Sequence, residues 1–149
     1  MKPFIVLLVT FLISLVLIRL VSHEYDLALA GRIAMAVMML FTAIAHFAFA
    51  KGMTMMVPDF IPFKRAVVYV TGLMEVASAP GLLFPSTQVL TGWLLIAFFV
   101  ILLPANIKAA LQKIDYQKGD YTGNDKRYLW FRVPLQVLFI VWTYYSAIY

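Results

Sequence analysis

Five stretches of the 149-residue sequence are long and apolar enough to cross a lipid bilayer, or nearly so, and this feature limits the fold more than any other. A helix needs about 20 mostly apolar residues to span the hydrocarbon core. Because no water is present there, backbone groups must bond within the helix itself. The sequence therefore predicts an all-α integral membrane protein, a single transmembrane domain with spans at about residues 3–21, 27–50, 66–84, 89–107 and 128–148.

The composition excludes several classes of protein. Hydrophobic residues make up 64% of the chain and charged residues 13%, and a core of this size cannot hide so much apolar surface from water. A soluble enzyme, a disordered tail and a disulfide scaffold are thereby excluded. The chain has no cysteine, so thiol nucleophiles and iron–sulfur ligation are excluded too, and any redox role must use a bound cofactor. We expect no covalently bound cofactor.

The first apolar stretch has a second interpretation, a cleaved signal peptide. Lys2 supplies a positive start, and Ala28–Ala30 resembles a small-residue cleavage site. That site lies well beyond Ile18, where the uninterrupted apolar run ends, and inside the next apolar stretch. We therefore expect a spanning helix, with Arg19 extending toward the headgroups.

Two connecting segments carry structure of their own. Residues 51–64 contain Pro58 and Pro62, which cannot continue a helix, and their Met and Phe side chains, Met56 among them, predict an interfacial or re-entrant cap. Residues 108–127 are expected to form an amphipathic surface helix followed by a polar, turn-forming loop.

The distribution of lysine and arginine predicts the orientation. The charges are scattered between the apolar stretches and form no basic stripe, so no nucleic-acid partner is expected. Cytoplasmic loops of membrane proteins carry an excess of such residues. Arg19 and Arg32 fall on one side, and the opposite side is far richer, which predicts an inside N-terminus and an outside C-terminus. The residues of the richer side are Lys2, Lys51, Lys64, Arg65, Lys108, Lys113, Lys118, Lys126 and Arg127.

Polar residues inside the spans are functional candidates, because they are costly in lipid. Glu75 lies ten residues past Arg65, about 15 Å into the membrane at the rise of an α-helix. Arg132 and Gln136 stand four residues apart and share a helix face. We expect one ligand pocket beneath the cap residues Met56, Pro58 and Pro62. Its candidate lining residues are His46, Glu75, Asn106, Arg132 and Gln136.

A structural interpretation stays open for each candidate. Arg132 can extend to the headgroups, His46 can cap its helix, and Asn106 can satisfy a carbonyl freed by the nearby proline. Gln136 can bond across helices, and Glu75 can be the partner of Arg132. No metal site is expected, since only His46 and Glu75 are plausible ligands.

The sequence resembles the DoxX family of small bacterial membrane proteins over about residues 30–145. The resemblance implies a four-helix bundle, to which the first span is an N-terminal addition, in the bacterial cytoplasmic (inner) membrane. For some relatives it implies association with an oxidoreductase, as in a thiosulfate:quinone oxidoreductase subunit. It supplies no catalytic residue set. The matching motifs are Ala45–Phe47, Met56–Pro62, Val70–Glu75, Gly81–Pro85, Gly92–Trp93, Pro104–Ile107 and Arg132–Gln136, with Trp142.

These observations lead to one principal functional hypothesis and two alternatives. The principal hypothesis is a membrane subunit or partner of an oxidoreductase that binds a hydrophobic small molecule, a quinone or a lipid, in the intramembrane pocket. The first alternative is a stand-alone lipid-modifying enzyme, in which a buried carboxyl and a histidine move protons as in sterol isomerases. The second is a non-catalytic assembly factor or small transporter. Catalytic residues are not assigned.

Overall fold

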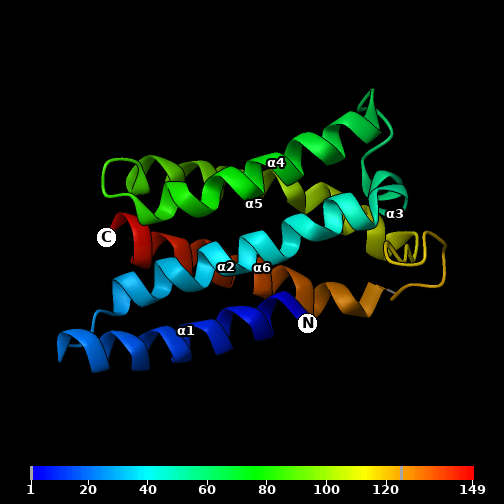
Figure 1. Cartoon of the computed structure of the whole chain (residues 1–149). Helices are drawn as coiled ribbons and strands as arrows, with labels where there is room; N and C mark the ends of the chain where they lie inside the picture. Colours follow the sequence, from blue (N-terminus) through cyan, green and yellow to red (C-terminus); the bar gives the residue numbers. More distant parts are fainter. Residues whose placement is uncertain (1, 125) are drawn as a thin grey trace.

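The fold is a bundle of long helices in a computed structural model that describes residues 2–124 and 126–149 (Figure 1). No β-strand occurs in the described part of the chain, which has only an isolated bridge between Asp115 and Asp120. The helices are α1 (Lys2–Ser22), α2 (Leu27–Ala48), α3 (Ala50–Met56), α4 (Lys64–Leu83), α5 (Gln88–Leu111) and α6 (Leu129–Thr143), with a 3-10 turn at Lys126–Tyr128 and a π-helical turn at Tyr144–Ile148.

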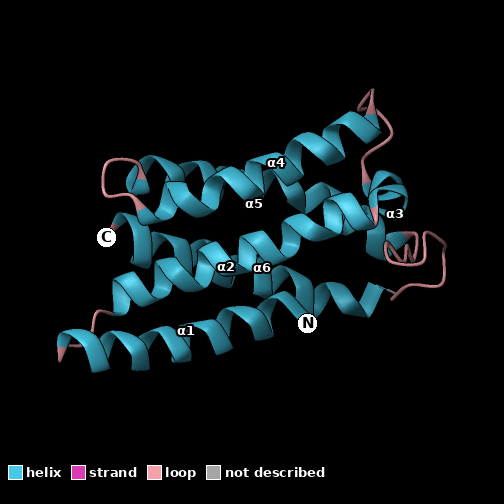
Figure 2. Cartoon of the chain, viewed as in Figure 1, coloured by secondary structure: helices cyan, strands magenta, loops and turns pink. Residues whose placement is uncertain are grey.

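The prediction of five membrane-spanning helices is confirmed at the level of length and hydropathy. α1, α2, α4, α5 and the segment Lys126–Ile148 are each long and apolar enough to cross a membrane. Consecutive long helices run antiparallel, and the loops lie at the two ends of the bundle (Figure 2). The protein therefore has the architecture of a multi-pass membrane protein.

The core lies around α2, whose residues Met35, Met38 and Met39 are almost fully buried. These side chains pack with buried residues of α4, α5 and α6, including Leu82 and Phe139. α1 lies along α2 at the edge of the bundle and is mostly exposed. The packing core is thus formed mainly by α2, α4, α5 and α6, and α1 lies on one side and contributes the fully buried Leu7.

The segment predicted as an interfacial cap consists of the short helix α3 and the loop that follows it, and we call Ala50–Phe63 the cap. Lys108 of α5 holds the cap in place, since its Nζ donates to the Val57 carbonyl and to Asp59 Oδ1, each at 2.8 Å. Lys64 Nζ donates to the same Asp59 oxygen at 2.6 Å. These two hydrogen bonds, Lys108 first, lower the pKa of Asp59 to about 2.

The prediction of a separate amphipathic surface helix after the fourth span is wrong. α5 continues through the predicted boundary at residue 107 and ends at Leu111. Lys113 then has a positive φ of 53°, which ends the helix, and the Ile114 N–H turns back to the Ala109 carbonyl. The following loop is turn-rich as expected, because the Asp115 carboxylate accepts backbone N–H groups there.

Candidate functional site

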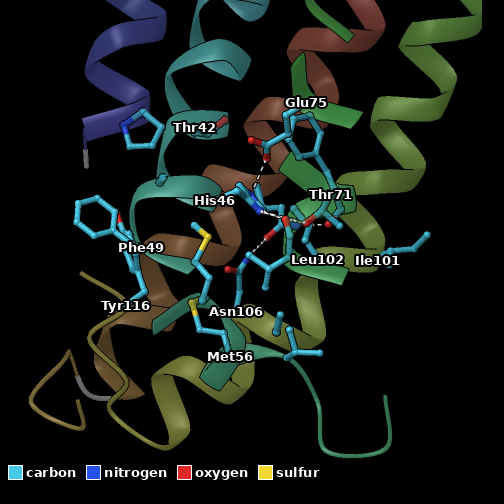
Figure 3. A pocket seen from close by; sticks show the side chains of 18 of the residues that line it. Thr42, His46, Phe49, Met56, Thr71, Glu75, Ile101, Leu102, Asn106 and Tyr116 are labelled. Atoms are coloured by element: carbon cyan, nitrogen blue, oxygen red, sulfur yellow. Dashed lines mark hydrogen bonds and ion pairs between the residues drawn. The ribbon is translucent and has the colours of Figure 1, made fainter. Parts of the chain in front are cut away.

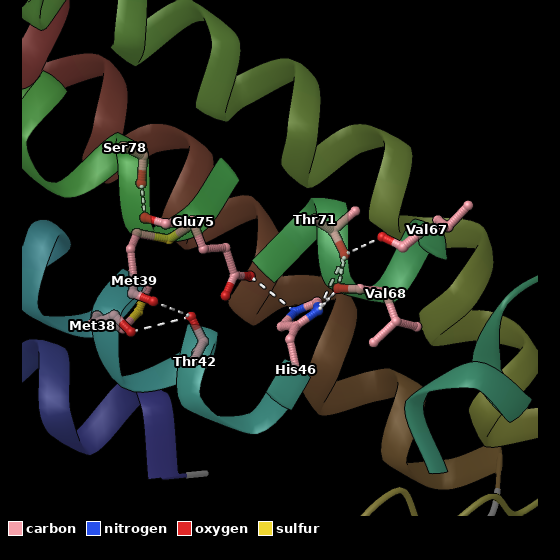
Figure 4. Close-up of polar contacts among 9 residues, drawn as sticks. All are labelled: Met38, Met39, Thr42, His46, Val67, Val68, Thr71, Glu75 and Ser78. Atoms are coloured by element: carbon pink, nitrogen blue, oxygen red, sulfur yellow. Dashed lines mark hydrogen bonds and ion pairs between the residues drawn. The ribbon is translucent and has the colours of Figure 1, made fainter. Parts of the chain in front are cut away.

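His46 of α2 and Glu75 of α4 meet where these two helices lie close together. Gly72 makes the approach possible, because a Cβ atom at this position would lie 2.7 Å from His46 Cβ. Both side chains are buried, with 8% and 4% of their residue surface exposed. His46 Nε2 lies 3.4 Å from Glu75 Oε1, and a dashed line marks this contact in Figure 4. Glu75 therefore pairs with His46 and not with Arg132, the structural partner that the sequence had left open.

The hydrogen bonds of His46 define its tautomer. Nδ1 lies 2.9 Å from the Val68 carbonyl and 3.1 Å from Thr71 Oγ1. A backbone carbonyl only accepts hydrogen bonds, so Nδ1 carries a hydrogen. The charge of the ring then depends on Nε2, the atom that faces Glu75. An attractive contact between these two side chains needs one proton, held on Nε2 or on the carboxyl group.

One carboxyl oxygen of Glu75 is unpaired within the described part of the chain. Its Oε2 atom is buried and has no hydrogen-bond partner among the described residues. Buried polar atoms almost always have a partner. Across from Glu75 in Figure 4, Thr42 Oγ1 donates to the carbonyls of Met38 and Met39, so its hydrogen is occupied within α2. Oε2 is thus available to a group inside the cavity described below.

Asn106 and Gln136 connect α5 to α6. Asn106 Nδ2 donates to Gln136 Oε1 at 2.8 Å, and Gln136 Nε2 donates to the Phe99 carbonyl. The structure therefore supports the bonding across helices that the sequence suggested for Gln136. Asn106 therefore bonds to a side chain and not to the carbonyl of Val100, which lacks its usual backbone donor because Pro104 has no N–H group.

Arg132 is half-buried near the start of α6. Its guanidinium carbon lies 5.9 Å from the centre of the Tyr128 ring, a cation–π contact. Within residues 2–124 and 126–149, no carboxylate forms an ion pair with it. The guanidinium therefore keeps its hydrogen-bonding capacity for another group.

All five candidate residues line one cavity of about 770 Å³. Its walls are mostly apolar and come from every long helix, including the first residues of α1. The cap residues Met56 and Pro58 also line it, whereas Pro62 does not. Figure 3 shows the polar groups of His46, Glu75 and Thr71 on one side of this space, with Asn106 below them. The convergence predicted from the sequence is present in the structure.

Among the charged and titratable residues that line this cavity, three were not predicted from the sequence. Tyr128 lies one helical turn before Arg132, and this spacing could have revealed it. Tyr116 belongs to the loop after α5, where no periodicity applies. Lys2 reaches the cavity only because α1 packs along α2, a placement that hydropathy does not give.

A second, smaller cavity of about 300 Å³ adjoins the first. Lys2, Asn106, Tyr128 and Arg132 line both spaces. The remaining walls of the smaller cavity are largely polar and include Asp115 and other residues of the loop after α5. Arg132 thus stands where an apolar space meets a polar one.

The described part of the chain holds no group of three or more His, Cys, Asp or Glu side chains that could bind a metal ion. A further polar cluster lies at the other end of α2, away from the cavity. There Arg32 Nη1 donates to the Ser146 carbonyl at 3.1 Å, and Trp142 Nε1 donates to the Gly31 carbonyl at 3.1 Å. These bonds attach the end of α6 and the π-helical turn to α2.

Comparison with known proteins gives one result. No curated protein and no solved structure matches the chain significantly. A family model described as "Domain of unknown function (DUF8561)" matches residues 35–147, which include all five cavity residues named above and leave out α1. Because the match covers most of the sequence, the chain belongs to the DUF8561 family.

Proposed function

We propose that the protein binds a hydrophobic small molecule, a quinone or a lipid, in the cavity between its helices. The observation that carries this proposal is the cavity itself, about 770 Å³ in volume and mostly apolar, with polar side chains from four helices gathered in it. Binding sites for small molecules are typically about 300–1,000 Å³, apolar, and equipped with a few convergent polar groups.

The ligand would enter from the lipid. Two residues of the cavity wall, Ile44 of α2 and Ile101 of α5, keep 64% and 72% of their surface exposed. On a membrane-embedded bundle, such side chains face the acyl chains. A molecule dissolved in the bilayer can therefore reach the cavity without crossing the aqueous phase.

The polar residues of the cavity would have different roles in ligand binding. Arg132 would donate hydrogen bonds to oxygen atoms of the ligand, with Asn106 beside it. The pair of His46 and Glu75 would hold one proton, and the free Glu75 Oε2 would contact the ligand. If a partner protein supplied two electrons to a bound quinone, the pair would donate its proton as one of the two that the quinol takes up, and water would supply the other.

The setting we propose is that of a DoxX-like subunit or partner of an oxidoreductase in the bacterial cytoplasmic membrane, with the N-terminus inside and the C-terminus outside. The motif resemblance supports the family setting. The lysine and arginine excess at the end of the bundle where α4 begins and α5 ends supports the orientation. A Gly119→Cys variant should react with a membrane-impermeant maleimide only in inverted vesicles, and reaction in intact cells would reverse the orientation.

Binding of decylubiquinone to the purified protein in lipid nanodiscs tests the proposed function. We expect saturable binding that weakens at least tenfold in Glu75→Gln and in Arg132→Ala. The matched control is Arg65→Ala, which removes an arginine outside the cavity and should bind as the unchanged protein does. Unchanged binding in both cavity variants would refute the pocket.

A stand-alone lipid-modifying enzyme is the second candidate, favoured by one observation. A histidine of fixed tautomer beside a carboxyl group with a free oxygen can move protons within a lipid substrate without a redox partner. Incubation of the purified protein with total membrane lipids distinguishes the two candidates. A lipid isomer formed by the protein alone, and lost in His46→Gln, would support the enzyme.

A further inference from the structure

Among the described residues, no anion pairs with Arg132, which is half-buried in the protein. The acidic side chains of the two cavities have other partners. Glu75 pairs with His46, and Asp115 accepts the backbone N–H groups of Gln117 and Lys118 and lies 3.9 Å from Lys118 Nζ. A partly buried cation without a counter-ion is unfavourable.

The charges that face the two cavities leave an excess of positive charge at one place. The charged and titratable lining residues are Lys2, His46, Glu75, Asp115, Tyr116, Tyr128 and Arg132. With one proton, the pair of His46 and Glu75 is neutral overall, and Asp115 is compensated by its own loop. Lys2 and Arg132 line both cavities, and neither forms an ion pair in the part of the chain that the structure describes.

The position of Arg132 indicates which part of a ligand, the headgroup or the alkyl chain, each of the two cavities would hold. Arg132 lines both the larger, mostly apolar cavity and the smaller, more polar one. The guanidinium fork matches the two oxygens of a carboxylate or a phosphate. The Tyr128 ring contacts the guanidinium and helps to fix its position. A neutral carbonyl group would leave the positive charge uncompensated.

We infer that the ligand is an acidic amphiphile, whose carboxylate or phosphate group pairs with Arg132 in the polar cavity while its alkyl chain fills the apolar one. This inference rests on the proposed function and narrows it, because it selects an anionic headgroup over the neutral ring of a quinone.

Four probes test the inference on the full chain in nanodiscs of uncharged phosphatidylcholine. Dodecanoate, dodecyl phosphate and dodecan-1-ol share one alkyl chain, and inorganic phosphate has no chain. Binding is measured by titration with native mass spectrometry. We expect at least one of the two anionic amphiphiles to bind about tenfold more tightly than the alcohol, or better, as charge-assisted hydrogen bonds do. Inorganic phosphate should not bind at the same concentrations.

Variants connect this preference to Arg132. Arg132→Gln should bind the anions and the alcohol equally, Arg132→Lys should keep a preference for the anions, and Arg65→Gln should behave as the unchanged protein. Thermal unfolding of each variant shows whether it is folded. If Arg132→Gln does not fold, Lys2→Gln replaces it and should reduce the preference at least twofold.

The other outcomes would overturn the inference. Equal binding of the alcohol and the anions would show that the ligand needs no acidic headgroup, whereas the proposal of a lipid-binding cavity would stand. Binding of inorganic phosphate as tight as that of dodecyl phosphate would indicate an anion site without a role for the chain. If no amphiphile binds, the inference fails, and parallel titration with decylubiquinone shows separately whether the proposed function fails with it.

Discussion

The pair of His46 and Glu75 leads to a quantitative prediction about stability. In Glu75→Leu, the buried Nε2 atom of His46 loses its only side-chain partner among the described residues. In Glu75→Gln, the amide keeps the shape of the carboxyl group and can donate to an unprotonated Nε2. The two variants should therefore differ in the stability of the folded protein, although each removes the same carboxyl group.

The size of the difference follows from the burial of the pair. A buried polar atom left without a partner costs about 1–3 kcal/mol. If the two side chains carry opposite charges, removal of one costs about 3–5 kcal/mol. The glutamine variant should lose less than about 1 kcal/mol, because a neutral hydrogen bond replaces the original contact. For a chain of this size, about 1–3 kcal/mol corresponds to a difference in Tm of about 2–12 °C.

Thermal unfolding in detergent, followed by the helical circular dichroism signal, measures this difference. A double-mutant cycle with His46→Ala separates the pair from each side chain alone, and we expect a coupling free energy of about 0.5–3 kcal/mol. Equal Tm values for the leucine and glutamine variants, together with additive effects in the cycle, would refute the reasoning.

Three further predictions concern the parts that position the site. Asp59→Asn should increase hydrogen exchange in the cap, and unchanged exchange in the variant would contradict this expectation. The pKa of Asp59 is about 2, below its ordinary 3.8. The stabilisation of the cap by this carboxylate is therefore complete above about pH 4 and disappears as the pH falls through 2. Gly72→Ala should change the stability of the folded protein by less than about 2 kcal/mol, because the higher helix propensity of alanine offsets part of the overpacking. It should still weaken ligand binding, because the added carbon displaces His46. The control is the lipid-facing Val70→Ile, which also adds one carbon and should leave ligand binding unchanged. Gln136→Leu should destabilise the protein by about 1–3 kcal/mol, since it removes both amide bonds to α5; an unchanged Tm would argue against the interhelical role.

The helices and their approximate ends could be predicted because bilayer thickness and hydropathy together fix the length of a spanning helix. The end of α5 could not. Its apolar periodicity continues past Leu111, but the backbone turns at Lys113, whose positive φ no pattern of residue types reveals. Local backbone geometry overrides periodicity at such a position.

The convergence of the five polar residues could be predicted from helix faces, since residues three, four and seven apart lie on one side. The partner of Glu75 could not, because it depends on how far each helix is rotated and shifted against its neighbours. The close approach at Gly72 brings His46 to Glu75 and leaves Arg132 to another role. The sequence alone does not give these rotations and shifts between neighbouring helices.

The central claim is that a lipophilic molecule occupies the cavity, and native mass spectrometry of protein purified gently from its own membrane tests it most directly. The matched variants are Ala45→Trp, which fills the cavity, and Ala48→Trp, which adds the same side chain to an exposed position of α2. We predict a bound small molecule in the unchanged protein and in Ala48→Trp, and its loss in Ala45→Trp. No bound molecule in the unchanged protein, or equal retention in both variants, would contradict the claim.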